Sequence, residues 1–328
     1  MIIHDDIQLI RERIEKSDNI AVFAHVRPDG DSIGSTLALG WALEDMGKKV
    51  QLISEDPVPE RFYFLFQFTK DGKNPYKPVP ENADCYIVPD ISSPDRAGKF
   101  FTDQPDLKAD ICIDHHVSNE GHAKLNWIES DSPAACCVLT ELLPQLGVKL
   151  TKRISSALLC GLITDTNSFS TSNVTVESLR AAADLVDNGA SIFNICYSAH
   201  KEHSKSEMAL WQLGMNNIHI EGDYIWSVLR KADRDAIGYI GDDDAGFVSY
   251  MGNTQGINVS ILFIEVDENE TKISWRSLPG YNVSFVATAC GGGGHAAASG
   301  ATMYGKLEDI IPTVLETTKR IISKNRSK

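Results

Sequence analysis

The sequence predicts an α/β protein: a parallel β-sheet with helices on both faces in an N-terminal domain, followed by a smaller α/β domain. Apolar runs of strand length alternate with stretches of helical spacing in the first part of the chain, and strand-like runs predominate after it. The length of 328 residues allows two domains. We place a first domain at residues 1–193, a connector at 194–214 and a second domain at 215–328. We expect the functional site in the cleft between the two domains.

The elements of the first domain follow from apolar periodicity. A helix is predicted at about residues 5–17, and the next apolar run, NIAVFAHV, has the length and composition of a buried strand. The Pro-rich and aromatic segment from Asp56 to Pro80 is predicted to be irregular. Three further strands are predicted at KKVQLIS, DCYIVPDIS and ADICIDHH, and four helices at DSIGSTLALGWALEDMG, SPAACCVLTELLPQLG, TKRISSALLCGLITDT and TVESLRAAADLVDNGA.

The second part of the chain has a different pattern. The stretch at about 194–211 is polar and compatible with a connecting helix, and strands are predicted at DYIWSVL, VSILFIEV and TKISWRS. Trp275, in the last of these, is expected in the core. The run CGGGGH at 290–295 precedes HAAASGA, whose small residues suggest a packed helix. We therefore interpret the glycine run as a phosphate-binding helix N-terminus.

Polar residues cluster where the predicted strands end. Ligands of open α/β sheets bind beyond the carboxyl ends of the strands, so these side chains should meet at one sheet edge. Each motif alone has an ordinary explanation: Asp31 could cap the next helix, DGD could be a turn and DHH an exposed loop. Carboxylates this close repel one another unless a cation lies among them. The residues are His25, Asp29, Asp31, Asp90, Asp114, His115, His116 and, at the end of a helix, Asp165.

Charge and cysteine content limit the functional classes. The net charge of −14 argues against binding of long nucleic acid through a basic stripe. The seven cysteines lack C-x-x-C spacing and lie mostly in apolar runs, which predicts buried free thiols. The N-terminal stretch has no basic region followed by an apolar core, and no apolar run is long enough to cross a membrane. We expect a cytoplasmic protein without membrane association.

The motifs HVRPDGDSIGS, VPDISSPDR, IDHH and LITDTNSF resemble the four motifs of the DHH phosphoesterase family, in the same order. KISWRS and GGGGHAAASG resemble the DHHA1 domain that accompanies it, so the resemblance covers about residues 18–305. One departure is Asn167, where many relatives have glycine. The aspartate of that motif, Asp165, is retained, so the departure concerns the shape of the loop.

The resemblance implies two Mn²⁺ ions, with Mg²⁺ or Co²⁺ as substitutes. Imidazole and carboxylate ligands without a cysteine suit such ions. By similarity, one ion takes His25, Asp29 and Asp90, and the other takes Asp31, Asp90, His115 and Asp165, so that Asp90 bridges them. Asp114 then orients its neighbours. His116 either contacts the scissile phosphate and protonates the departing oxygen or makes only a structural hydrogen bond.

The second domain is implied to hold the substrate. Arg276 ends a predicted strand and offers a planar fork suited to phosphate, while glycines let backbone N–H groups approach an anion. By similarity, this domain holds the far phosphate or nucleotide. The implied substrate-binding residues are Arg276, Ser277, Gly292, Gly293, Gly294 and His295.

Among the members of this family, the chain most resembles the stand-alone oligoribonucleases. The implied activity is hydrolysis of RNA of two to about five nucleotides, including linear dinucleotides such as pApA or pGpG. The implied partners are such RNAs or nucleoside bisphosphates, with 3'-phosphoadenosine 5'-phosphate as a further substrate. A cyclic-dinucleotide phosphodiesterase, an inorganic pyrophosphatase or exopolyphosphatase, and a non-catalytic nucleotide-binding regulator stay open, as does a homodimer.

Overall fold

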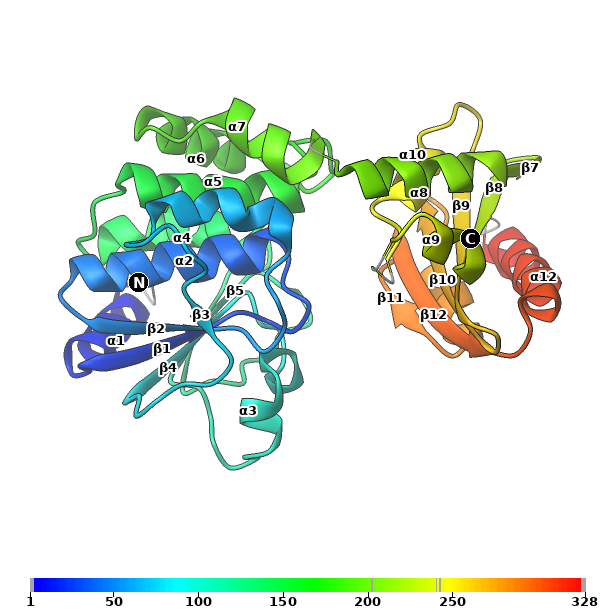
Figure 1. Cartoon of the computed structure of the whole chain (residues 1–328). Helices are drawn as coiled ribbons and strands as arrows, with labels where there is room; N and C mark the ends of the chain where they lie inside the picture. Colours follow the sequence, from blue (N-terminus) through cyan, green and yellow to red (C-terminus); the bar gives the residue numbers. More distant parts are fainter. Residues whose placement is uncertain (1–2, 202, 240, 242, 326–328) are drawn as a thin grey trace. The chain divides into compact units, whose positions relative to one another are not determined.

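The computed structural model of the chain describes residues 3–201, 203–239, 241 and 243–325. It divides into two compact units, Met1–Glu202 and His203–Lys328, shown in Figure 1. Within the described residues, no helix is both long and apolar enough to span a lipid bilayer.

The first unit is built on a six-stranded sheet in which every strand pair is parallel, in the order β3-β2-β1-β4-β5-β6. Its strands are β1 (Asn19–Phe23), β2 (Lys49–Ile53), β3 (Tyr76–Lys77), β4 (Cys85–Pro89), β5 (Ile111–Asp114) and β6 (Leu125–Ile128). Its helices are α1 (Ile3–Glu15), α2 (Gly30–Asp45), α3 (Lys99–Thr102), α4 (Ala135–Gln145), α5 (Lys152–Asp165), α6 (Val176–Asp187) and α7 (Ile192–Cys196), with short turns of other helix types at η1 (Glu60–Phe68), η2 (Pro94–Ala97) and η3 (Tyr197–Lys201).

Both faces of this sheet are covered, as predicted, because side chains alternate along each strand. In β1, Ile20 and Val22 face a core shared with α1, α2, α4 and α5. Ala21 and Phe23 face a smaller core on the other side, where Phe101 of α3 packs against Phe23 with ring centroids 5.0 Å apart. The larger helical layer is visible in Figure 1.

Two sequence predictions for this unit were incomplete. The segment expected to be irregular contains η1, whose Phe62, Leu65 and Phe66 are buried. The short edge strand β6 was not predicted, because its four residues are only partly buried and lack a strong alternation. Five cysteines are buried and all seven are free thiols, as expected from the apolar runs that contain them.

Helices α2 and α5 pack unusually closely, which matters for the site. A Cβ on Gly34 of α2 would lie 2.4 Å from the carbonyl oxygen of Ala157 in α5. A Cβ on Gly161 would lie 2.5 Å from a carboxylate oxygen of Asp31. Glycine is therefore required at both positions, and the close approach places the start of α2 beside the end of α5.

The second unit contains a six-stranded sheet in the order β11-β12-β10-β9-β8-β7, in which β8 and β9 are parallel and the other pairs antiparallel. Its strands are β7 (His219–Glu221), β8 (Tyr224–Leu229), β9 (Val259–Asp267), β10 (Glu270–Ser277), β11 (Gly293–Gly294) and β12 (Ala298–Tyr304). Its helices are α8 (Lys205–Asn216), α9 (Lys231–Ala236), α10 (Phe247–Gly252), α11 (Ser284–Ala289) and α12 (Leu307–Asn325).

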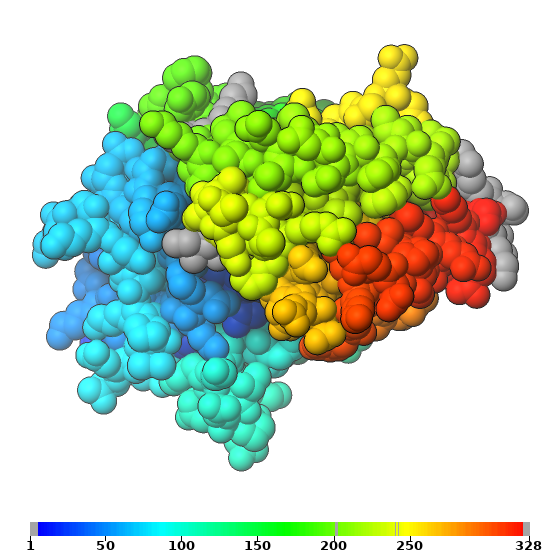
Figure 2. Space-filling model, turned by 45° about the vertical axis from the view of Figure 1, so that its right-hand side comes forward, coloured from blue at the N-terminus to red at the C-terminus, as the bar shows by residue number. Residues whose placement is uncertain are grey.

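The long helix α12 forms part of the surface of this unit, in red in Figure 2. Its residues Ile310, Val314 and Ile322 are buried in the same core as Trp275, which is fully buried as expected.

The prediction of a helix after the glycine run is wrong. Residues 298–304 form strand β12, which pairs with β10 on one side and with β11 on the other. Alanine favours helix when a segment is isolated, but pairing with two neighbouring strands outweighs that preference. The glycines consequently lead into a tight β-turn region and not into a helix N-terminus.

Candidate active site

The polar residues that follow the strands gather where the strand order reverses. Strand β1 has β2 on one side and β4 on the other, so the connections leaving β1 and β4 run to opposite sides of the sheet. Such a reversal leaves a crevice beyond the carboxyl ends of the two strands. His25 and Asp29 follow β1, and Asp90 follows β4.

The two aspartates of DGD have different structural roles. Asp29 is the N-cap of α2, since its Oδ1 accepts hydrogen bonds from the backbone N–H groups of Asp31 and Ser32 at 3.1 and 3.0 Å. The alternative in which Asp31 caps this helix is therefore wrong. Asp31 is fully buried, and its carboxylate accepts hydrogen bonds from the N–H groups of Ala135 and Cys136 at 2.6 and 2.9 Å. The N-terminus of α4 thus holds this carboxylate in place.

Asp90 lies between two histidines. Its Oδ2 is 3.5 Å from Nε2 of His25, and its Oδ1 is 3.5 Å from Nε2 of His115. The residue adopts a left-handed backbone conformation, with φ of 56°, which aspartate tolerates better than most residues. One carboxylate therefore presents a separate oxygen to each imidazole.

The remaining residues complete two groups around Asp90. In the first, Nε2 of His25 is also 3.5 Å from Oδ2 of Asp29. In the second, Nε2 of His115 lies 3.7 Å from Oδ2 of Asp31 and 3.5 Å from Oδ2 of Asp165. The candidate ligand atoms within each of the groups His25–Asp29–Asp90 and Asp31–His115–Asp165 lie within 4.8 Å of one another. The structure thus brings together all six residues that the resemblance implies as ligands.

Both histidines are oriented through their other ring nitrogen. Nδ1 of His25 is 2.9 Å from the carbonyl oxygen of Val26, and Nδ1 of His115 is 3.2 Å from that of Ser132. If each Nδ1–H donates to its carbonyl, each Nε2 carries a lone pair directed at the carboxylates. A metal-binding histidine is commonly fixed by such a bond.

His116 lies at the edge of the cluster. Its Nδ1 is 2.8 Å from Oδ1 of Asp114, which is fully buried, while its side chain is 32% exposed. The other oxygen of Asp114 accepts a hydrogen bond of 2.6 Å from Nδ2 of the buried Asn119. The Asp114 hydrogen bond raises the pKa of His116 against the opposing effect of burial. The Nε2 atom of His116 makes no hydrogen bond to a described residue.

Burial and neighbouring charges shift the pKa values of the cluster. Burial would lower the pKa of His25, but hydrogen bonds and charges from Asp29 and Asp90 raise it to about 10. For His115, burial is likewise outweighed by Asp90, Asp31 and Asp165, which raise its pKa to about 10. Burial and the charge of Asp90 raise the pKa of Asp31 to about 7. These shifts show how strongly the site favours positive charge.

Two buried atoms at the centre lack a hydrogen-bond partner among the described residues: Oδ1 of Asp90 and Nε2 of His115. Buried polar atoms are normally paired, because leaving one unpaired costs free energy. These two atoms lie 3.5 Å apart. A divalent ion that accepts oxygen and nitrogen ligands would satisfy both, so the donor set fits a metal of the manganese type.

The residues predicted to bind substrate in the second unit are more exposed. Arg276 is the penultimate residue of β10, is partly buried and donates a hydrogen bond of 3.0 Å to the carbonyl oxygen of Trp275. His295 is exposed, and its backbone N–H donates to the carbonyl oxygen of Ala298. The Ser277 hydroxyl donates toward the carbonyl oxygens of Tyr281 and Ala296. It therefore joins two loops.

The three glycines implied as substrate contacts differ in their surroundings. A Cβ on Gly292 would lie 2.1 Å from the carbonyl oxygen of Gly300, and one on Gly294 would lie 2.7 Å from that of Ala298. A Cβ on Gly293 would meet nothing within 4 Å. Close packing against β12 explains why positions 292 and 294 are glycine. Of the three glycines, only Gly293 has open space in front of its Cα.

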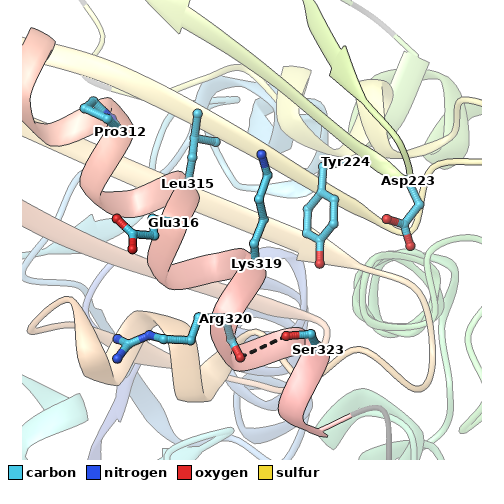
Figure 3. A pocket seen from close by; sticks show the side chains of 8 residues that line it. All are labelled: Asp223, Tyr224, Pro312, Leu315, Glu316, Lys319, Arg320 and Ser323. Carbon is cyan, nitrogen blue, oxygen red and sulfur yellow. Dashed lines mark hydrogen bonds between the residues drawn. The ribbon is translucent and has the colours of Figure 1, made fainter.

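The second unit also has an open surface pocket beside α12 (Figure 3). Tyr224, Leu315 and Lys319 are among its lining residues, and Lys319 forms an ion pair with Glu221. None of the residues singled out in the sequence lines this pocket, and we assign it no role.

Sequence reasoning missed the residues that orient the cluster. Asn119 holds Asp114, and the segment from Ser132 to Cys136 holds both His115 and Asp31. Asn119 stands three residues beyond the DHH motif, which is a weak positional signal. The backbone groups of the other segment carry no side-chain signal at all.

The comparisons agree with this fold. Residues 19–162 match the DHH family, N-terminal domain, and residues 226–324 match the DHHA1 domain. The chain therefore belongs to the DHH phosphoesterase family and carries a DHHA1 domain. As a member of that family it is a hydrolase.

Two bacterial relatives resemble this chain over nearly its whole length. It is 28% identical over 326 residues to the bifunctional oligoribonuclease and PAP phosphatase NrnA of Thermus thermophilus, covering 98% of this chain and 95% of that protein. It is 26% identical over 306 residues to the Bacillus subtilis protein of the same description, covering 90% of this chain and 93% of that protein.

Solved structures share the fold. An exopolyphosphatase-related protein from Bacteroides fragilis superposes with a TM-score of 0.87 at 22% identity, covering 98% of each chain. RecJ from Thermus thermophilus in complex with Mn²⁺ gives a TM-score of 0.56 at 13% identity, covering 98% of this chain and 54% of that chain. Identities this low speak for the shared fold alone.

Proposed function

We propose that the protein hydrolyses phosphodiester bonds in short oligoribonucleotides and also removes the 3'-phosphate of 3'-phosphoadenosine 5'-phosphate, using two divalent metal ions. The observation that carries this proposal is the position of the Asp90 carboxylate. Each of its two oxygens lies 3.5 Å from Nε2 of a different histidine. A carboxylate placed in this way suits a bridge between two ions. Paired ions of this kind are common in enzymes that cleave phosphate esters.

In the proposed site, His25, Asp29 and Asp90 would hold one ion, and Asp31, Asp90, His115 and Asp165 would hold the other. When bound, such a pair lowers the pKa of water and stabilises charge on the oxygens of a phosphate undergoing displacement. Manganese is the proposed ion, because the ligands are imidazole and carboxylate.

The chain's own residues then orient and protonate the substrate. The Asp114 carboxylate accepts from Nδ1 of His116 at 2.8 Å, and Asn119 donates to the other oxygen of Asp114 at 2.6 Å. This arrangement leaves Nε2 of His116 available to donate a proton to the departing oxygen. Asp114 and Asn119 support this step by fixing the ring, in a role similar to that of other carboxylate–histidine pairs.

The relatives support the proposed substrate class. The Thermus thermophilus and Bacillus subtilis proteins, both described as oligoribonucleases and PAP phosphatases, align over at least 90% of this chain and of their own length. Linear dinucleotides such as pApA and pGpG belong to the same class. Arg276 and His295, with the open backbone at Gly293, would hold the part of the substrate far from the scissile bond.

A phosphatase of polyphosphate or pyrophosphate is the second candidate. The Bacteroides fragilis protein of the same fold is described as exopolyphosphatase-related. The DHHA1 match over residues 226–324 and the oligoribonuclease relatives favour the nucleotide substrate.

The test is a product time course in Mn²⁺ with 5'-labelled RNAs of two to 24 nucleotides, alongside 3'-phosphoadenosine 5'-phosphate, a cyclic dinucleotide and pyrophosphate. The expected result is rapid release of mononucleotides from the shortest RNAs and of phosphate from the bisphosphate. If the protein released phosphate from pyrophosphate and cleaved none of the nucleotide substrates, the result would establish the second candidate. Tight nucleotide binding without turnover would indicate a regulator.

A further inference from the structure

An arginine to which sequence reasoning gave no role lies against the candidate metal centre. Arg96 belongs to η2, and its carbonyl oxygen accepts a hydrogen bond of 2.8 Å from the N–H of Val26, next to His25. This main-chain bond ties η2 to the loop after β1. The Nη2 atom of Arg96 lies 3.1 Å from Nδ1 of His25. A guanidinium is thereby placed beside one of the proposed ligands.

The contact with His25 does not satisfy this guanidinium. Nδ1 of His25 is also 2.9 Å from the carbonyl oxygen of Val26. A guanidinium can only donate, so Nδ1 would have to accept from Arg96, whereas it would have to donate to Val26. A neutral histidine that ligates through Nε2 carries its proton on Nδ1. In that state Nδ1 donates to Val26, and Arg96 has no acceptor in the ring.

Arg96 also lacks a counter-ion. Two other partly buried arginines of this unit have such a partner, Arg13 with Asp110 at 3.1 Å and Arg153 with Asp45 at 2.5 Å, whereas Arg11 donates to the carbonyl oxygen of Gln145. Among the residues that the structure describes, no carboxylate lies within 4.0 Å of Arg96. A partly buried cation without an anionic partner is costly, and a second cation next to it raises that cost.

The charges of the proposed site identify the missing partner. The four carboxylate ligands Asp29, Asp31, Asp90 and Asp165 balance the charge of two divalent ions, and the carboxylate of Asp114 is paired with His116 at 2.8 Å. Arg96 then adds one further positive charge. A phosphodiester group carries one negative charge, and its unesterified oxygens match the planar fork of a guanidinium. We propose that Arg96 binds the scissile phosphate group of the substrate and stabilises the charge that builds on it during displacement.

This inference rests on the proposed two-metal function, and it separates Arg96 from Arg276. A residue at the scissile phosphate should matter for every phosphodiester, including bis-p-nitrophenyl phosphate. A residue that holds only the far nucleotide should matter much less for that small ester. The comparison of two substrates therefore distinguishes the two arginines.

The experiment compares Arg96→Gln and Arg96→Lys with Arg180→Ala, which removes an exposed arginine of the same unit whose ion-pair partner among the described residues is Glu177. Bound manganese, melting temperature and AMP affinity by calorimetry in Mn²⁺ are measured first. Then kcat/KM is measured on a dinucleotide and on bis-p-nitrophenyl phosphate. Arg96→Gln should keep its manganese, bind AMP about ten-fold or more weakly, and lose about 10- to 100-fold in kcat/KM on both substrates. Arg96→Lys should recover part of the loss and Arg180→Ala should resemble the wild type.

Several outcomes would overturn the inference. Unchanged AMP affinity in Arg96→Gln with manganese retained would show that Arg96 does not bind phosphate. Loss of manganese or a large fall in melting temperature in both Arg96 variants would show that Arg96 has a structural role in positioning His25. A wild-type protein that cleaves neither RNA nor 3'-phosphoadenosine 5'-phosphate would refute the proposed function, whereas weaker AMP binding in Arg96→Gln would still support the role of Arg96.

Discussion

The candidate metal centre and the candidate substrate-binding residues of the second unit are built in opposite ways. In the first unit, His25 and Asp90 are 3% and 2% exposed, and buried hydrogen bonds orient the carboxylates and imidazoles around them. In the second unit, His295 is exposed, and among the described residues the side chain of Arg276 donates a hydrogen bond to the neighbouring carbonyl oxygen of Trp275.

This difference has a physical reason. Like charges can be kept close together only if the surrounding structure holds them rigidly, so metal ligands are oriented before the ion arrives. A residue that binds successive substrates must exchange partners with water, so an exposed and weakly held side chain is suitable. The following predictions test whether the two regions divide the work in this way.

Replacing Asp90 by Ala or Asn should have the largest effect. A direct ligand to both ions should matter more than an orienting residue, whose loss typically costs about 10- to 100-fold in metal affinity or activity. We therefore expect turnover to be abolished and manganese to be lost. Circular dichroism should show a folded protein, because Asp90 follows a strand and is not part of the apolar core. A folded Asp90→Ala protein with normal hydrolysis would remove the two-metal proposal.

His116→Ala should lower kcat on a dinucleotide by about 10²- to 10⁴-fold if His116 is the general acid. The loss should be much smaller on a p-nitrophenyl ester, whose departing oxygen needs no proton. Asn119→Ala should show the same substrate dependence with a smaller loss in kcat, because Asn119 acts through Asp114. Equal losses on both esters would mean that His116 has only a structural role.

Arg276→Ala and His295→Ala should retain manganese and lose about 10- to 100-fold in kcat/KM on dinucleotides, the effect of removing one charge-assisted contact. Hydrolysis of bis-p-nitrophenyl phosphate should change little, since that ester has no distal phosphate. If either variant lost manganese, or lost activity equally on both substrates, the second unit would belong to the chemical site itself.

The metal-free protein should become less stable as pH rises from about 6.5 to 10. His25 and His115 have pKa values near 10 in the folded chain against 6.5 in the unfolded chain, so their stabilising effect is complete below 6.5 and is lost on the way to 10. Asp31, raised from 3.8 to about 7, acts in the same direction at lower pH. Melting curves with chelator and with Mn²⁺ should diverge as pH increases. Parallel curves would contradict this linkage.

The smallest effect is expected at Asn167. Its φ is 44°, and the next two residues are also left-handed, a backbone conformation that glycine adopts without strain. Asn167→Gly should leave activity and stability nearly unchanged. Asn167→Val should lower the free energy of unfolding by about 1–3 kcal/mol, because a β-branched residue is strained in this conformation. Urea denaturation measures both, and equal stability of the two variants would argue against backbone strain.

Much of the fold was predictable from short-range patterns. The apolar runs around β1, β4 and β5 have the length and composition of buried strands, and each is followed by its polar residues in sequence. The α2 and α5 segments show helical spacing. The segment after the glycine run was mistaken for a helix because its alanines favour helix locally, whereas two neighbouring strands make it β12.

The sequence alone specified which side chains could reach one sheet edge, because strand periodicity and the motif residues are local properties of the chain. It could not specify that Asp29 caps α2 while Asp31 is buried against the start of α4, since that depends on residues 104 positions away. Nor could it specify that Asp90 faces a different histidine with each oxygen. It also could not specify that Arg96 lies beside His25 and forms no ion pair with a carboxylate of the described residues. Those contacts exist only after β1, β4 and β5 have paired, because strand pairing brings distant loops to a common edge.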